Sequence, residues 1–420
     1  MKKYILSKYF SNKEIINNFI WRSLQSIGKQ AVTFIIVILC AKLLSPYDFG
    51  IYNYILAIVF LLIMFCDFGI SSATSKYVAE FNSTDKIKLK YILFNSLILI
   101  IGFGSIIIFL IMLFGKYIFF DNYLFILYTI PLLFLIPISS LYDGIFRGLK
   151  KFKTLAWITL AVGGISIIIV YLIVTTFGLI GALISQSVFY TLLVLVLSIV
   201  NGKFEFKFDK TLMRQILNYS LIIGISSIGY FLYSRVDILI LAQFGYIQEI
   251  GFYEIINRGF EFMFLPFVLL AQVISPNITA IFSNHKYTLV RNKLRFFMKL
   301  IIPLAILMAI LFYLLFPMFI QTFLPAYYIS EMIIIITILT FLIPSKIWGV
   351  FQTQSFIVAT GYAKIIAITT LICGFLNVIL DIIFIELIGF TGVFLTTLLI
   401  HTANIVFQTY YYNLKMKELK

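Results

Sequence analysis

Apolar residues in this chain gather into blocks of about 20, and this block length is the feature that most limits its fold. A helix of about 20 apolar residues crosses a hydrocarbon layer about 30 Å thick, whereas a barrel strand shows alternation over segments of about 10. Only 12% of the residues are charged and 62% are hydrophobic, so lipid must cover most of the surface. The expected spans are 19–41, 51–75, 91–114, 122–140, 155–176, 179–200, 215–243, 252–275, 296–319, 331–352, 365–387 and 390–411. The sequence therefore predicts an all-α membrane protein of about twelve transmembrane helices.

Basic residues alternate between the loops that join these spans. One set of loops and termini carries about 26 lysines and arginines. The opposite set carries two, Lys42 and Lys116. Because basic loops stay on the cytoplasmic side, both termini are predicted to be cytoplasmic. The net charge of +15 is explained by this bias and by contact with anionic lipid headgroups, so no nucleic-acid partner is expected.

The two halves of the chain share short phrases. Segment 45–52 (SPYDFGIY) resembles segment 246–253 (YIQEIGFY), 201 residues later, and 26–28 (SIG) recurs at 227–229 with the same offset. Near the ends of the halves, 177–181 (FGLIG) resembles 388–392 (IGFTG). Six spans per half keep the halves in one orientation, related by an axis along the membrane normal.

This repeat predicts two six-helix lobes. The expected N-terminal lobe is 1–200, the cytoplasmic linker is 201–214, and the C-terminal lobe is 215–420. A substrate site between two such lobes, with alternating access, is the usual arrangement in transporters of this kind.

Several phrases, in order along the whole chain, carry a family resemblance. They are 41–52 (AKLLSPYDFGIY), 67–70 (DFGI), 146–152 (FRGLKKF), 235–237 (RVD), 251–253 (GFY) with Arg258, and 377–381 (NVILD) ahead of Gly389 and Gly392. With them the sequence resembles Wzx-type polysaccharide and O-antigen flippases of the multidrug/oligosaccharidyl-lipid/polysaccharide exporter superfamily.

The resemblance implies a MATE-like fold in a bacterial inner membrane. It also implies transfer of undecaprenyl-diphosphate-linked oligosaccharide to the periplasmic leaflet, as in O-antigen, lipopolysaccharide or capsule synthesis. Expected partners are the lipid-linked substrate, anionic lipids, and a polysaccharide polymerase with its chain-length machinery. No cofactor is expected, and coupling to H⁺ or Na⁺ is left open.

Charged residues at membrane depth are the candidate site residues, because each costs about 2.5–3.5 kcal/mol there unless it meets a partner or a cavity. Lys29 and Asp67 both lie roughly 14 Å deep on the same side, at about 1.5 Å per helical residue. Two interpretations remain open. The residues form a structural ion pair, or Lys29 binds phosphate and Asp67 balances its charge when substrate is absent.

Most of the remaining candidates lie in the second half. Arg258 has Glu254 four residues before it and Glu261 three after, which predicts a Glu–Arg–Glu cluster on one helical face. This cluster either stabilises a helix end or offers a cation or proton site. Arg235 and Asp237 are two residues apart and are expected not to pair.

A diphosphate needs several cations, so the expected binding set is Lys29, Arg235, Arg258 and Lys346. The acids expected to act as counter-ions or in cation or proton coupling are Asp67, Asp237, Glu254 and Glu261. His401 is interpreted as a packing residue, with proton coupling as the alternative. Asp381 is interpreted as a residue near a helix end.

Other functions fit the sequence less well. A membrane glycosyltransferase or polymerase needs a sizeable loop with catalytic acids, and an ATPase needs a Walker motif; the sequence shows neither, so an enzyme is not expected. A cation-coupled multidrug exporter of the same superfamily should have an acidic cavity, whereas this chain has four intramembrane bases. A lipid II flippase is mildly disfavoured, because no span beyond twelve is expected.

Overall fold

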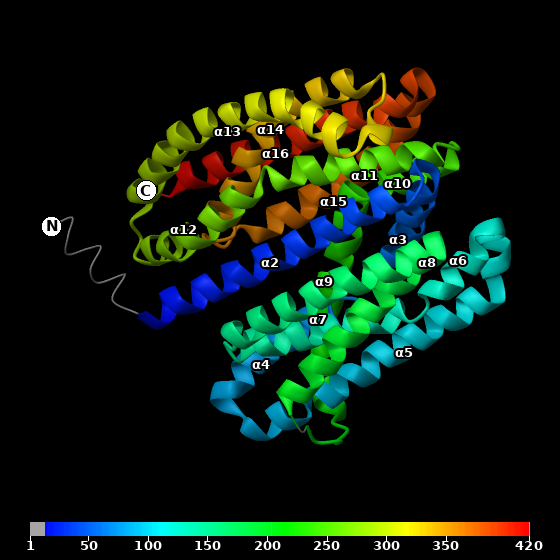
Figure 1. The fold of residues 1–420 in the computed structure, drawn as a ribbon. Coiled ribbons are helices and arrows are strands. Elements are labelled where there is room, and N and C mark those ends of the chain that lie inside the picture. The colour runs from blue at the N-terminus through cyan, green and yellow to red at the C-terminus, as the bar shows by residue number, and fades with distance from the viewer. Residues whose placement is uncertain (1–12, 203, 420) are drawn as a thin grey trace. The chain divides into compact units, whose positions relative to one another are not determined.

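The structure is a computed structural model that describes residues 13–202 and 204–419, with side chains from residue 20 onward. Lys2, Lys3, Lys8, Lys203 and Lys420, which contribute to the loop-charge pattern, lie outside the described residues, and only the backbone of Lys13 is described. Throughout those ranges the regular structure is helical (Figure 1). The all-α prediction is confirmed for this part of the chain.

Nine helical segments of the described chain are long and apolar enough to cross a membrane. Three of them, Lys86–Thr129, Phe152–Asn201 and Ala363–Glu418, have 44, 50 and 56 residues. Each is about twice the length that one crossing needs, and each is interrupted by a turn: at Phe120–Asn122, at Gly178, and at Gly389–Thr391. The chain is a multi-pass membrane protein. Twelve spans and cytoplasmic termini stay predictions.

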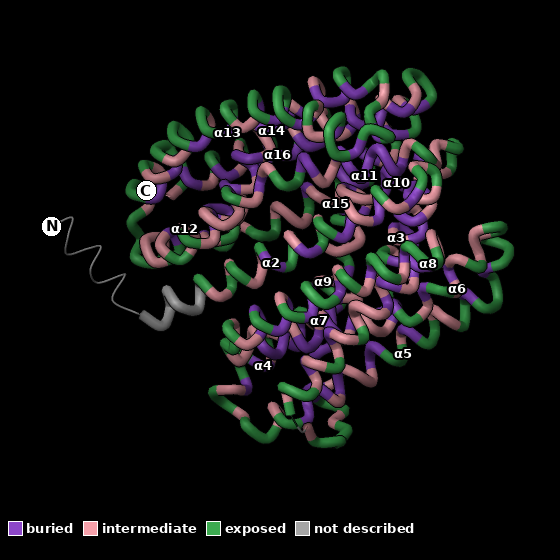
Figure 2. The backbone as a smooth tube through the Cα atoms, in the orientation of Figure 1, coloured by how far each residue is buried: buried purple, intermediate pink, exposed green. Residues whose placement is uncertain are grey.

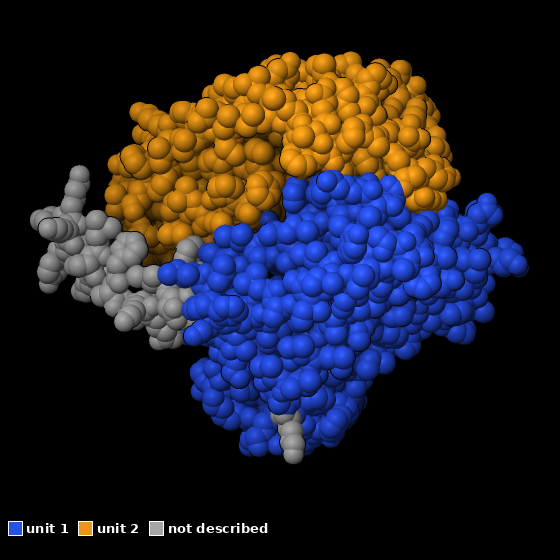
Figure 3. Space-filling view, in the orientation of Figure 1, with its two compact units in different colours: residues 1–44, 55–227 blue, residues 45–54, 228–420 orange. Residues whose placement is uncertain are grey.

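The chain divides into two compact units, coloured separately in Figure 3. Unit 1 is Met1–Leu44 with Ile55–Ser227, and unit 2 is Ser45–Tyr54 with Ile228–Lys420. Helices α3 (Pro46–Asp67) and α9 (Lys210–Ser234) each contribute to both units. The expected lobe boundaries at 200 and 215 stay predictions.

Unit 1 is built around the long helix α8 (Phe152–Asn201). Besides α8 and parts of α3 and α9, it contains α2 (Lys13–Leu43), α4 (Ile70–Thr84), α5 (Lys86–Phe119), α6 (Tyr123–Thr129) and α7 (Leu132–Gly148). Helix α8 packs on α2 and α7, and α4 packs on α5 and α7. Their core includes the buried side chains of Ile70, Leu93 and Phe146.

The polar segment after α8 is tied to α5 within unit 1. The side-chain amide of Asn95 donates to the carbonyl of Lys207 at 2.9 Å, and its oxygen accepts from the backbone N–H of Asp209 at 2.9 Å. Asp209 in turn accepts from the N–H groups of Thr211 and Leu212 at the start of α9. A carboxylate in this position satisfies helix N–H groups that have no partner within the helix.

Unit 2 contains the remaining helices. They are α10 (Val236–Gln243), α11 (Ile247–Phe262), α12 (Leu265–Ser283), α13 (Tyr287–Phe323), α14 (Met332–Gln352), α15 (Ala363–Ile388) and α16 (Gly392–Glu418). A π-helical turn, Thr353–Ile357, follows α14. Helix α14 packs on α13 and α16, α16 packs on α15, and α10 packs on α11 and α15.

Exposed residues recur along several helices (Figure 2), and many of them are large and apolar. On α13, for example, Leu307, Leu314 and Leu315 are between 52% and 56% exposed. In water such faces would drive aggregation, whereas lipid tails cover them without cost. The exposed faces therefore support a membrane environment.

The glycines of the repeated phrase lie at a close helix contact in unit 2. A Cβ atom on Gly50 would lie 1.8 Å from the carbonyl oxygen of Ile247, and one on Gly251 would lie 2.9 Å from the carbonyl oxygen of Pro46. Residues 50 and 251 are 201 apart in the sequence, and so are 46 and 247. The two contacts are therefore equivalent under the repeat, as a twofold relation between α3 and α11 requires.

Candidate functional site

A break in the helix places Arg235 at the centre of a charged cluster. Helix α9 ends at Ser234 and α10 begins at Val236, and Arg235 between them has a non-helical backbone with φ −141° and ψ −13°. The side chain reaches α11, where Nη1 lies 3.2 Å from Oε2 of Glu254. Nε and Nη2 of Arg235 face no other carboxylate within ion-pair distance in the described chain.

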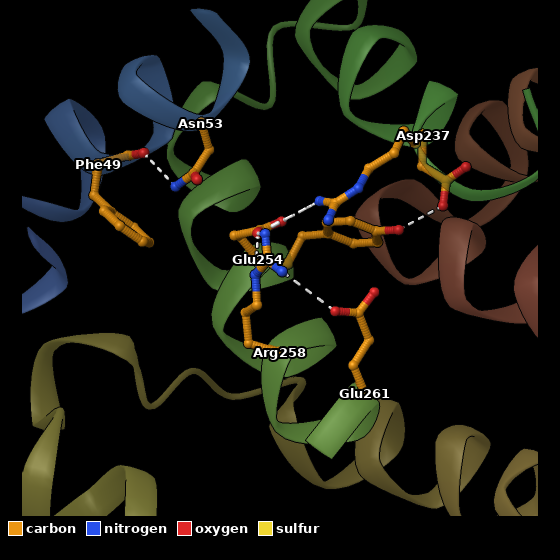
Figure 4. A network of polar contacts seen from close by, with 8 residues as sticks. Phe49, Asn53, Asp237, Glu254, Arg258 and Glu261 are labelled. Atoms are coloured by element: carbon orange, nitrogen blue, oxygen red, sulfur yellow. Dashed lines mark hydrogen bonds and ion pairs between the residues drawn. The ribbon is translucent and has the colours of Figure 1, made fainter. Parts of the chain in front are cut away.

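Glu254 also binds the second arginine of the cluster (Figure 4). Arg258, one turn later on α11, contacts Oε1 of Glu254 at 2.6 Å and Oε2 of Glu261 at 3.3 Å. The Glu–Arg–Glu arrangement expected from the sequence spacing is therefore present, with Arg235 added to it from α10's N-terminal side. We call Arg235, Glu254, Arg258 and Glu261 the arginine cluster.

Exposure differs sharply within the arginine cluster. The side chain of Glu254 is 2% exposed, whereas those of Arg235 and Arg258 are 24% and 21% exposed. The shared carboxylate is thus buried, whereas the two arginine side chains are partly exposed. A guanidinium has five N–H donors, so each arginine can bind an anion while it keeps its bond to Glu254.

Asp237 belongs to a separate buried group that joins α10, α11 and α15. The hydroxyl of Tyr253 donates to Oδ2 of Asp237 at 2.5 Å, and Nδ2 of Asn377 donates to Oδ1 of Asp237 at 2.7 Å. The same amide lies 3.3 Å from Oδ2 of Asp381, whose Oδ1 is buried without a hydrogen-bond partner among the described residues. Arg235 and Asp237 do not contact each other, as their spacing predicts.

Asp381 lies toward the C-terminal end of α15, as its place in the expected span indicates, but it is a buried residue and not a residue of the helix terminus. The residue lies within α15, about two turns before the helix ends at Ile388, and it is fully buried. Together with Asn377 and Tyr253 it was absent from the expected site. The spacing of Asn377 and Asp381, one turn apart in an apolar helix, was the signal that could have identified them.

In unit 1 the two candidate charges are not joined. No ion pair links Lys29 and Asp67 in the side chains described from residue 20 onward, and Lys29 is exposed. Asp67 instead accepts from the N–H and hydroxyl groups of Ser71, at 3.0 and 2.5 Å, across the turn between α3 and α4. At this turn Gly69 has a φ of +82°, which favours glycine. The interpretation of Lys29 as a phosphate ligand stays a prediction.

Lys346 and His401 lie together in unit 2. Lys346 Nζ on α14 contacts Nδ1 of His401 on α16 and lies 5.3 Å above the ring of Tyr233. Nothing in the sequence indicated that these two basic residues pair, because they are 55 positions apart. No group of three or more His, Cys, Asp or Glu side chains that could bind a metal ion occurs in the part of the chain that was described.

The fold is that of known multidrug transporters. The chain is similar to the inward-facing structure of a multidrug resistance MATE family transporter of the MOP superfamily, with a TM-score of 0.78 and 15% identity over 96% of this chain and 98% of that one. It is also similar to the outward-facing structure of such a transporter, with a TM-score of 0.66 and 16% identity over 97% and 96%. These likenesses confirm the expected MATE-like fold.

A curated relative comes from Methanocaldococcus jannaschii and is described as an uncharacterized membrane protein. It is 27% identical over 265 residues, which cover 57% of this chain and 62% of the relative. The chain therefore spans less than two thirds of that relative.

The family itself is identified by a match over residues 15–282, more than half of the chain, to the family described as polysaccharide biosynthesis protein. This match covers α9, α10 and α11, and so it includes Arg235, Glu254 and Arg258. The chain therefore belongs to the polysaccharide biosynthesis protein family.

Proposed function

We propose that this membrane transporter moves undecaprenyl-diphosphate-linked oligosaccharide from the cytoplasmic to the periplasmic leaflet of a bacterial inner membrane by alternating access. The single observation that carries the proposal is the arginine cluster, in which two partly exposed arginine side chains share one buried carboxylate. The family supplies the saccharide, and the cluster supplies chemistry for its anionic carrier.

The arginine cluster suits an anion that binds and dissociates during transport. Without substrate, Glu254 and Glu261 neutralise the two arginines, which lowers the cost of their charge in a low-dielectric site. A diphosphate brings at least two negative charges and several acceptor oxygens. Guanidinium forks bind such oxygens in pairs, and Arg235 has two nitrogens with no carboxylate partner among the described residues.

The remaining expected residues are given subsidiary parts in this proposal. Lys29 of unit 1 is a further candidate cation for a phosphate group. Asp67, Asp237, Glu254 and Glu261 act as counter-ions, and coupling to H⁺ or Na⁺ is open to any of these acids. A polymerase with its chain-length machinery would consume the product outside, and anionic lipids would surround the basic loops.

The test uses purified protein in proteoliposomes that contain fluorescent undecaprenyl-diphosphate oligosaccharide. A membrane-impermeant quencher reports how much of it changes leaflet. Arg235→Ala should abolish transfer while the protein stays in the membrane, and Arg235→Lys should leave a small residual rate because lysine lacks the fork. Arg295→Ala, at an exposed arginine of α13, is the matched control and should transfer at the native rate.

Normal transfer by Arg235→Ala would overturn the role given to the arginine cluster. A native chain that fails to move the lipid but expels a cationic dye would replace the proposal with a drug exporter. In cells, Arg235→Ala and Lys29→Ala should both lose surface polysaccharide at unchanged protein levels.

A further inference from the structure

A second polar cluster in unit 2 contains two basic side chains and no acid. Lys346 of α14 contacts His401 of α16, and the His401 ring stacks on Tyr233 of α9 with centroids 4.2 Å apart and an angle of 25° between the planes. His401 is 7% exposed and Tyr233 is 9% exposed. Cys373 of α15 completes the surroundings. Helices α9, α14 and α16 thus meet at two basic side chains, and α15 packs against Tyr233.

The contact between Lys346 and His401 limits how many protons they carry. A lysine ammonium only donates, and a protonated imidazole only donates, so the nitrogens can share a hydrogen bond only if one of them is neutral. Nδ1 is the nitrogen of His401 that contacts Lys346. A neutral ring that accepts a hydrogen bond at Nδ1 carries its own proton on Nε2. This arrangement carries one proton fewer than two separate cations.

No carboxylate compensates a further charge at this place. The acids whose charges act on Lys346 are Glu261 of α11 and Asp237 of α10. Neither lies within ion-pair distance of it among the described residues, and each already has partners: Arg258 for Glu261, Tyr253 and Asn377 for Asp237. Tyr233 and Cys373 are neutral. A second proton would therefore place two cations in contact in a buried site.

Helix α14 has two features close to Lys346 at which it can bend. Pro344 lies two residues before Lys346 and removes a backbone hydrogen bond, and the π-helical turn Thr353–Ile357 begins seven residues after it. Prolines and π-turns are the places at which helices bend. Repulsion between Lys346 and His401 would thus move α14 away from α16 at a part of α14 that bends readily.

We propose that Lys346 and His401 form a proton-binding site, and that uptake of the second proton breaks their contact and moves α14 against α16. This inference rests on the proposed transport function, to which it adds proton coupling at a named site. It assigns Lys346 to the proton instead of to the diphosphate. The transporter would change state when the site is doubly protonated and return when one proton leaves.

The first test needs no substrate. The chain has two histidines, so His285→Gln leaves His401 as the single reporter for ¹⁵N-histidine NMR of the purified protein. At neutral pH the spectrum should show a neutral ring with its proton on Nε2. In Lys346→Met the ring should become doubly protonated at a proton concentration about tenfold or more lower, because the neighbouring cation is gone. Lys299→Met, at an exposed lysine of α13, should leave the titration unchanged.

The second test follows lipid transfer in proteoliposomes across a pH range. His401→Asn keeps an acceptor for Lys346 but does not titrate, so transfer should continue and lose its pH dependence. An unchanged pH profile in His401→Asn, or an unchanged His401 titration in Lys346→Met, would overturn the proposal. Lys346→Gln replaces Lys346→Met if the latter elutes as an aggregate. If the native chain moves no lipid, the proposed function fails, and the NMR titration still decides on the proton site.

Discussion

The two copies of the repeated phrase keep the same helix contact but differ in chemistry. Gly50 and Gly251 make equivalent close approaches between α3 and α11. Three residues later, the first copy has Asn53 and the second has Glu254. Among the described residues the side chain of Asn53 donates to the carbonyl of Phe49 alone, one turn before it, at 2.8 Å. Glu254 instead binds two arginines (Figure 4).

The difference extends to the whole arginine cluster. The offset of 201 pairs Arg235, Arg258 and Glu261 of the second half with Phe34, Ala57 and Phe60 of the first, and it pairs Asp237 with Ile36. These four charged residues of the second copy thus correspond to apolar residues in the first, and Glu254 corresponds to the uncharged Asn53. The close contact between α3 and α11 is common to both copies of the phrase, whereas the arginine cluster is formed by residues of the second half.

The largest expected effect comes from removing the charge that distinguishes the second copy. Glu254→Gln gives position 254 an amide, as at Asn53, and leaves two arginines without their buried counter-ion. Loss of one partner of a buried ion pair costs about 3–5 kcal/mol. Thermal unfolding of the detergent-purified protein should show a large drop in midpoint.

Glu261→Gln is the matched control for this prediction. Its side chain is 48% exposed, and exposed ion pairs contribute about 1 kcal/mol or less. Equal midpoints for Glu254→Gln and Glu261→Gln would contradict the assignment of Glu254 as the central carboxylate.

The shared helix contact is tested by adding a methyl group to each glycine. Gly50→Ala places a Cβ against a backbone carbonyl that cannot turn aside, so about 3 kcal/mol of destabilisation is expected. Gly251→Ala, with its longer approach, should cost about 1–2 kcal/mol. Unfolding midpoints measure both variants.

Gly102→Ala is the control, because no atom lies within 4 Å of its Cβ position in α5. Here alanine should stabilise the helix by up to about 1 kcal/mol. If all three variants behave alike, the close contact between α3 and α11 does not exist in the folded protein.

The helical class, the family and the Glu254–Arg258–Glu261 arrangement on one helix could be predicted from the sequence. These features depend on composition or on neighbours within one helix, which a sequence displays directly. The contacts of Arg235 with Glu254, and of Lys346 with His401, span 19 and 55 positions and depend on a helix break and on helix packing. A sequence does not show which faces of two helices meet, so these pairings required the structure.

The third prediction concerns the hydrogen bond that ties α11 to α10. Tyr253→Phe removes the donor to Asp237 and leaves its Oδ2 without this partner. A hydrogen bond to a charged group contributes about 1.5–3 kcal/mol, so a drop of that size in unfolding free energy is expected. Tyr230→Phe, at a tyrosine that is 64% exposed on α9, should have no measurable effect. Equal effects of the two would show that Tyr253 acts through packing alone.

The smallest effect is expected at Asn53, the counterpart of Glu254 in the first copy. The carbonyl that accepts from its side chain also accepts within helix α3, so Asn53→Ala leaves no unpaired backbone group and should cost about 1 kcal/mol. Because Asn53 makes no hydrogen bond to the arginine cluster among the described residues, its effect should add to that of Glu254→Gln within about 0.5 kcal/mol. A double variant with a clearly non-additive unfolding free energy would mean that the two copies are coupled at this position, and the division between shared packing and separate chemistry would then have to be given up.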